Sequence, residues 1–325
     1  MAWRLAALAL VTLVACGASL LVGGVAIAPG DVLAALAHPH AGTTATILWE
    51  LRLPRVAIAT CVGAALALAG ALLQGLLRNP LVDPYLTGVS AGAAAAIALA
   101  ILAGAAAPLL PALGFAVGLG AAILVAMLAR RGSGIDANRL ILAGVSLSAL
   151  FSAIVAFAIA RAASPDAAQQ ILAWLAGSIA GHTWRDLRFA APYLALGTLL
   201  AIGSIPALNA LRAGDLRART VGLDVGRAQW MILAAATLLT AASVTLAGIV
   251  GFVGLIVPHL ARRVVGSDAR GLLVASALLG AGLCAIADAV ARSIVAPSEL
   301  PIGVLLAFIG VPAFLYLYLH QEQRA

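Results

Sequence analysis

Long apolar runs interrupted by few charges are the feature that most constrains this chain of 325 residues. Hydrophobic residues make up 64% of the sequence and charged residues only 10%, whereas soluble domains contain roughly 45–50% and about 25%. A water-exposed surface cannot be built from so few charged side chains. The composition therefore predicts a polytopic membrane protein with an all-α fold. It excludes a soluble or disordered chain, a fibre and a protein whose main task is to bind nucleic acid.

Ten apolar segments are candidate membrane spans, because a helix needs about 20 apolar residues to cross a bilayer. Residues 228–265 are too long for one crossing, since they would extend roughly 57 Å at about 1.5 Å per residue. The glycines near Gly248 offer a break there. We predict one transmembrane domain, residues 1–325, with short surface helices and these spans: 3–27, 54–76, 85–105, 107–129, 139–161, 188–211, 228–247, 250–265, 271–291 and 300–319.

The positions of the basic residues, all 19 of which are arginine, predict the orientation. Cytoplasmic loops of membrane proteins carry an excess of basic residues. With the N-terminus inside, 13 arginines, Arg324 among them, fall on the cytoplasmic side and 6 on the outer side, whereas the 12 acids divide equally. The net charge of +7 is thus explained by topology. We expect a multi-pass protein with both termini in the cytoplasm.

The residues that are missing exclude several activities. The sequence contains no lysine, and a Walker A motif needs one to contact the β- and γ-phosphates of ATP. Any ATPase that drives this chain must therefore be another subunit. HExxH and CxxC motifs are also absent, and we expect no catalytic site, no resident metal and no enzymatic activity. We interpret His38 and His40, which flank Pro39, as loop residues, because no third ligand lies near them in the sequence.

Buried charge is scarce, and this argues against ion coupling. Asp288 is the acid that lies well inside an apolar run, and Arg292 follows it by four residues. Residues spaced i and i+4 share a helix face, so we predict a structural ion pair between them. Ion-coupled transporters usually place acids or bases in the middle of the membrane. The pattern favours a transporter whose energy comes from elsewhere.

Three connections, residues 29–53, 162–187 and 212–227, are too long or too polar for simple turns. Residues 162–187 contain a short apolar helix that ends near Ala176, is too short to span and is placed to cap a pore. Residues 212–227 are amphipathic and lie on the predicted cytoplasmic side. We interpret this last segment either as a helix on the membrane surface or as a docking site for a soluble partner.

Four segments resemble the permease family that imports vitamin B12, haem and ferric siderophores, the FecCD-type permeases of type II ABC importers. They occur in the family's order and extend over most of the chain. The segments are Leu-Arg-Leu-Pro-Arg at 51–55, the run 70–92 with Asn-Pro-Leu-Val-Asp-Pro, Gly-Phe-Val-Gly-Leu-Ile-Val-Pro-His-Leu-Ala-Arg-Arg at 251–263, and Glu-Leu-Pro-Ile-Gly at 299–303, followed by Ile-Gly-Val-Pro at 309–312.

The resemblance implies a function and partners. The chain would be the permease subunit that moves an iron complex (haem or ferric siderophore) or cobalamin from the periplasm to the cytoplasm, across the bacterial inner membrane. It would form a homodimer with the pathway at the subunit interface, and bind two ATPase subunits and a periplasmic binding protein. The resemblance implies no cofactor on this chain, since ATP and Mg are used by the partner ATPase.

The resemblance also implies site residues. Arginines at the outer face would dock the acidic residues of the binding protein, because a guanidinium binds carboxylates bidentately; interfacial anchoring is the alternative role. The docking residues are Arg52, Arg55 and Arg292. The ATPase-coupling residues, within 212–227, are Gly214, Asp215, Arg217, Arg219 and Gly222. The inner-gate residues, before the fifth span, are Asp136, Ala137 and Asn138.

Two other functions are compatible with the composition. An ion-coupled secondary transporter or channel would transport without an ATPase. A structural membrane subunit would not stimulate an ATPase in response to substrate. The importer interpretation requires both an ATPase and a binding protein.

Overall fold

The computed structural model describes residues 1–23, 27–39, 42–295 and 298–321. Residues 24–26 of the first predicted span, His40 and Arg324 lie outside these ranges. The fold is all-α, as the composition predicts, with one short antiparallel hairpin, β1 (Arg130–Arg131) and β2 (Gly134–Ile135), in the part of the chain that is described.

The first half of the chain forms two groups of helices. Bends and short turns interrupt it at Ile47–Arg52, a π-helical segment, and at Pro84–Thr87 and Ala107–Leu109, which are 3-10 turns. The helices are α1 (Ala2–Leu21), α2 (Pro29–Ala37), α3 (Gly42–Thr46), α4 (Leu53–Leu77), α5 (Val89–Leu102), α6 (Leu110–Leu128) and α7 (Ala137–Ala160).

The second half begins with a helix that does not span. It is followed by a bent pair, α9 and α10, whose axes differ by 47° at Ser204. The helices are α8 (Pro165–Leu175), α9 (Trp184–Gly203), α10 (Ile205–Arg212), α11 (Asp215–Thr220), α12 (Val225–Ala247), α13 (Val253–Val265), α14 (Ala269–Ala291) and α15 (Ile302–Gln321).

Each of the ten predicted spans overlaps a helix or a bent pair of the described residues, but the bounds and lengths differ. Six continuous helices of the described residues are long and apolar enough to cross a bilayer, or seven if the bent pair α9–α10 counts as one span. The other three predicted spans are shorter: α5 has 14 residues, α13 has 13, and the described apolar part of α15 is Ile302–Tyr316. The number of crossings therefore stays a prediction for these three segments.

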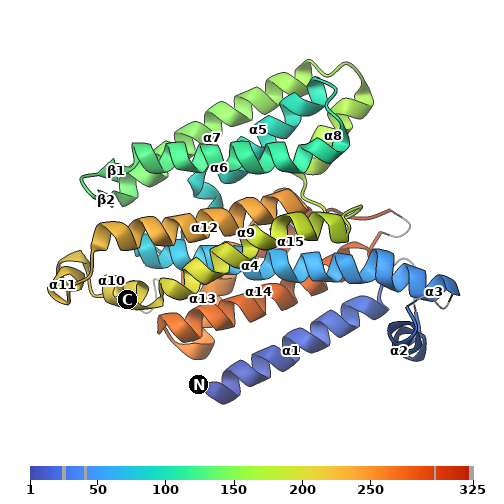
Figure 1. The fold of residues 1–325 in the computed structure, drawn as a ribbon, viewed down its shortest axis with the longest axis horizontal. Helices are drawn as coiled ribbons and strands as arrows, with labels where there is room; N and C mark the ends of the chain where they lie inside the picture. The colour runs from blue at the N-terminus through green and yellow to red at the C-terminus, as the bar shows by residue number, and fades with distance from the viewer. Residues whose placement is uncertain (24–26, 40–41, 296–297, 322–325) are drawn as a thin grey trace.

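Helix α4 is the centre of the structure. It packs against α12, α13 and α14, while α1 covers α14 on one side, and α5, α6 and α7 form a layer on the other side of α12 (Figure 1). Close approach is possible because glycines face each other. A Cβ atom on Gly63 would collide with the backbone of Gly280 in α14, and one on Gly70 with the backbone of Gly254 in α13. Small residues of this kind let helices in a membrane pack tightly.

The small-residue patterns of α5 and α6 face each other as well. A Cβ on Gly92 would lie 2.6 Å from the Cβ of Ala121, and one on Gly118 would lie 2.8 Å from the carbonyl oxygen of Val89. These glycines therefore pack the two helices of one chain together.

Candidate functional site

Three arginines meet at one end of the bundle, which we call the arginine end; it lies on the right in Figure 1. Arg52 and Arg55 flank the first turn of α4, where Pro54 suits a helix start. Arg292 follows the last residue of α14. Packing of α4 against α14 brings the three side chains together.

An ion-pair network connects these arginines. The Nε of Arg55 donates to both carboxylate oxygens of Asp288, at 2.9 and 3.1 Å, and its Nη1 donates to both carboxylate oxygens of Glu299, at 3.0 and 2.9 Å. The Nε of Arg292 lies 3.3 Å from Oδ2 of Asp288, which is the predicted i, i+4 pair. Asp288 is only 1% exposed, so its charge is compensated by two guanidinium groups.

The other two arginines also hold the end of α1. Nη1 of Arg52 donates to the carbonyl oxygens of Leu20, at 2.5 Å, and Leu21, at 3.2 Å. Nη2 of Arg292 donates to the carbonyl and hydroxyl oxygens of Ser19, at 2.7 and 2.9 Å. The last carbonyls of a helix lack partners within the helix, and a cation there is stabilising. Arg52 and Arg292 are 6% and 5% exposed. This geometry favours a structural role for these two residues.

A polar cavity of about 390 Å³ opens beside the network. His182, from the connection between α8 and α9, contributes an imidazole whose pKa is lowered by burial, although the nearby carboxylate of Asp186 opposes this effect. The cavity thus combines guanidinium, carboxylate and neutral imidazole groups. Its charged and titratable lining residues are Glu50, Arg52, Arg55, His182, Arg292 and Glu299.

The predicted coupling segment lies at the opposite end, which we call the hairpin end. Helix α11 is bracketed by Gly214 and Gly222, which have φ angles of 99° and 83°. Asp215 forms an ion pair with Arg78, at the end of α4, and Ala218 is buried. Leu216 projects outward and is 83% exposed. The side chains of Arg217, Arg219 and Val221 are exposed too.

The predicted gate residues form the start of α7 at this same end (Figure 1). Asp136 caps the helix by accepting the backbone N–H of Arg139 at 3.0 Å, and it pairs with Arg131 at 3.2 Å. These two interactions lower the pKa of Asp136. Ala137 and Asn138 form the first turn, half-buried and exposed, respectively. The hairpin that precedes them is held to α12, because Gln229 accepts the N–H of Ile135 at 2.8 Å.

Sequence reasoning missed two acids. Glu299 is the partner of Arg55, and its place in the Glu-Leu-Pro segment was the available signal. Asp83 lines a second, larger cavity between α5, α7 and α8. The stretch around Asp83 falls between the predicted spans 54–76 and 85–105, so the sequence predicts a connection there.

The all-α fold, with six or seven helices among the described residues that are long and apolar enough to cross a bilayer, is that of a multi-pass membrane protein. Comparison with known proteins identifies the family: the FecCD transport family matches residues 10–320. The chain belongs to this family of ABC transporter permeases, as the four sequence segments indicate.

Several relatives are similar over most of their length. The cobalamin import system permease BtuC of Halobacterium salinarum is 39% identical over 87% of this chain and 76% of its own. The hemin transport permease HmuU of Yersinia pestis is 39% identical over 86% and 85%. A solved metal-chelate type ABC transporter, in an inward-facing conformation, has a TM-score of 0.88 at 32% identity and covers 98% of this chain and 100% of its own.

Proposed function

We propose that this chain is the permease subunit of an ABC importer that carries an iron complex, haem or a ferric siderophore, or cobalamin inward across a bacterial inner membrane. The observation that carries the proposal is the fit to the metal-chelate transporter over almost the whole chain. Similar permeases are named for cobalamin, hemin and ferric dicitrate. This range of cargoes supports the substrate class and leaves the particular substrate open.

Energy would come from a separate ATPase bound at the hairpin end. The chain has no lysine and therefore no Walker A motif. Helix α11 offers Leu216 and Val221, which are exposed apolar side chains, beside the guanidinium groups of Arg217 and Arg219. A projecting apolar side chain with a charged rim suits insertion into a groove of a soluble partner. ATP and Mg would be bound by that partner.

A second copy of the chain would complete the pathway. Helix α7 is long and apolar, yet only 17% of its most apolar window is buried within one chain. Its exposed side chains include Leu142, Val145, Leu150 and Phe157. An apolar face of this kind suits contact with lipid or with another permease, and we propose that part of it faces the second subunit.

Uptake by the reconstituted system tests the function. We expect the purified chain alone to show no ATPase activity, and to transport only when the ATPase subunit and the binding protein are added to proteoliposomes with ATP. Transport of radiolabelled cargo and release of phosphate are the measurements. Transport by the chain alone under an ion gradient would instead establish a secondary transporter, and substrate without effect on the ATPase would point to a structural subunit.

We propose Arg55 as the main docking residue for the binding protein, supported by Arg52 and Arg292 behind it. Arg55→Gln is expected to weaken docking by no more than several-fold, because a surface ion pair contributes about 0.2–1 kcal/mol and only 13% of the Arg55 side chain is exposed to a partner. Arg55→Lys should recover only part of the loss. Docking should also weaken as salt rises. A pull-down with the binding protein across a salt series is the measurement.

The matched control is Arg161→Gln, which removes an exposed arginine outside the polar cavity. Equal docking by Arg55→Gln and the unmodified chain would leave Arg55 a structural member of the ion-pair network with Asp288 and Glu299. Recovery of docking when an acid of the binding protein is exchanged for arginine, together with Arg55→Glu, would identify the partner residue.

A further inference from the structure

Two helices of this protein begin at positions where the backbone is irregular. Helices α5 and α13 have 14 and 13 residues, or about 21 and 20 Å, and are shorter than the roughly 30 Å of a bilayer core. Each follows a non-helical stretch: residues 79–83 and the turn at Pro84–Thr87 precede α5, and residues 248–252 precede α13. Irregular backbone at membrane depth is tolerated only where it is enclosed by protein or lines a cavity.

The two irregular stretches are bound to each other. The hydroxyl of Tyr85 donates to the carbonyl of Val250 at 2.9 Å and accepts the N–H of Val250 at 2.7 Å. Gln74 of α4 donates to the carbonyl oxygens of Val82, Gly254 and Leu255, at 3.1–3.3 Å. Side chains thus form hydrogen bonds with backbone groups that have no partner within the interrupted helices, and they hold the two non-helical stretches side by side.

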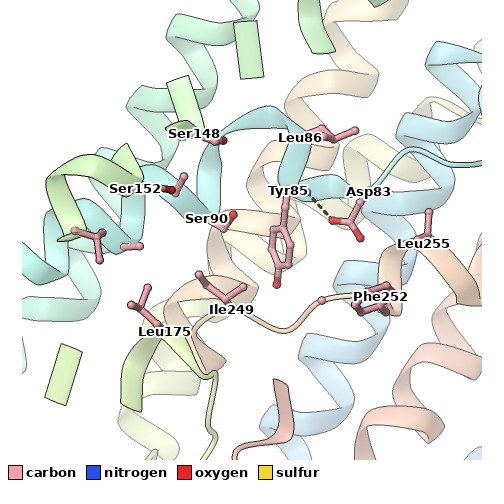
Figure 2. Close-up of a pocket in the computed structure, with 14 residues that line it drawn as sticks. Asp83, Tyr85, Leu86, Ser90, Ser148, Ser152, Leu175, Ile249, Phe252 and Leu255 are labelled. Carbon is pink, nitrogen blue, oxygen red and sulfur yellow. Dashed lines mark hydrogen bonds between the residues drawn. The ribbon is translucent and has the colours of Figure 1, made fainter. Parts of the chain in front are cut away.

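A cavity of about 620 Å³ lies where the breaks meet α7 and α8. Figure 2 shows Ser90, Ser148 and Ser152 on one side of the Tyr85 ring and Asp83 on the other, while Ile249 and Leu175 face them across the cavity. Ser148, Ser152 and Val155 follow the i, i+4, i+7 spacing of one helix face. Most of the remaining wall is apolar, as is usual in sites for small organic molecules.

Asp83 gives this cavity its charge. Its Oδ1 accepts the N–H of Tyr85 at 2.9 Å, but among the described residues no arginine lies within ion-pair distance of the carboxylate. Asp83 differs in this respect from Asp288, whose negative charge is compensated by Arg55 and Arg292. An ionisable residue that lines a largely apolar cavity without a charged partner points to a functional site.

We propose that this cavity receives part of the imported organic cargo, and that Asp83 selects parts that carry hydrogen-bond donors or positive charge over anionic ones. The apolar wall takes the hydrocarbon surface, and the serine hydroxyls and Asp83 take amide, hydroxyl or ammonium groups. The inference rests on the proposed import function and narrows its substrate class. Among the cargoes for which relatives are named, amide-rich cobalamin fits this chemistry better than the anionic ferric dicitrate complex.

Two fluorescent probes with one aromatic skeleton test the cavity directly. N-phenyl-1-naphthylamine is neutral and has an N–H donor, whereas 8-anilinonaphthalene-1-sulfonate adds an anionic group. The purified permease in lipid nanodiscs should bind the neutral probe about tenfold more tightly than the sulfonate. Ser148→Phe, which fills the cavity, should abolish this binding. The matched control is Ser146→Phe on the same helix, outside the cavity lining, and it should bind as the unmodified chain does.

Charge selection and the identity of the ligand are tested in the same assay. Asp83→Asn retains the acceptor for the Tyr85 N–H and should reduce the preference for the neutral probe roughly tenfold. Cyanocobalamin should displace the probe, and ferric dicitrate should not. The proposal would be overturned if Asp83→Asn kept the full preference for the neutral probe, or if Ser148→Phe and Ser146→Phe bound that probe equally well. It would also be overturned if added lipid displaced the probe and cyanocobalamin did not. Because no ATPase is present, these outcomes are independent of the uptake test of the proposed function.

Discussion

Asp288→Ala is expected to destabilise the permease by about 3–5 kcal/mol, the cost of removing one member of a buried charge cluster. The substitution leaves the guanidinium of Arg292 buried without its carboxylate, and Arg55 keeps only Glu299. It also loosens the end of α1, because Arg292 is oriented by Asp288 while it holds Ser19. Thermal unfolding in lipid nanodiscs, followed by tryptophan fluorescence, is the measurement.

An apolar replacement of the cluster is the control. Well-packed hydrophobic residues often replace a buried ion cluster without loss of stability. The triple variant Asp288→Leu, Arg55→Met, Arg292→Met should therefore recover most of the stability that Asp288→Ala loses. Recovery would show that uncompensated charge is the cause. If Asp288→Ala were as stable as the unmodified chain, the network would be a solvated surface feature and not a buried cluster.

The helices were predictable from sequence because one physical constraint dominates them. A segment of about 20 apolar residues in a chain with few charges has to be a buried or lipid-facing helix, and the ends of α4, α7, α12 and α14 follow the predicted spans closely. The short helices were less predictable. Hydropathy extends the predicted span 85–105 over the 3-10 turn at Pro84–Thr87, and the predicted span 250–265 over the non-helical residues before Val253.

The sites were predictable only in part. Spacing along one helix indicated the pair Asp288–Arg292, which the geometry contains at 3.3 Å. Arg55 contacts Asp288 and Glu299 across 233 and 244 residues of sequence, and no local pattern encodes such a contact. The sequence also does not reveal which arginine is buried. Arg52 and Arg55 look equivalent in sequence, but of these two only Arg52 donates to the carbonyls at the end of α1.

Disruption of the coupling segment should have the largest effect on transport. Asp215→Arg places a second cation beside Arg78, and Gly222→Pro cannot adopt the φ of 83° at that position, because proline fixes φ near −65°. The double variant is expected to lose ATPase binding and ATP-driven uptake while the membrane helices stay folded. Co-purification of the ATPase subunit and uptake of labelled cargo into proteoliposomes are the measurements.

A substitution at the exposed residue Leu216 distinguishes an effect on ATPase docking from an effect on folding. Leu216 is 83% exposed, so Leu216→Asp changes the surface of α11 and hardly its packing. If α11 enters a groove of the ATPase, this variant should bind the ATPase at least about tenfold more weakly, which corresponds to 1.4 kcal/mol. Arg130→Asp adds an acid to another exposed position at the hairpin end and should bind normally. Normal uptake by Leu216→Asp and by the double variant would remove α11 from the coupling mechanism and leave it a surface helix. Loss of uptake in both, with Arg130→Asp unaffected, would locate the transfer of force from the ATPase at α11, which is joined to the central helix α4 by the pair Asp215–Arg78.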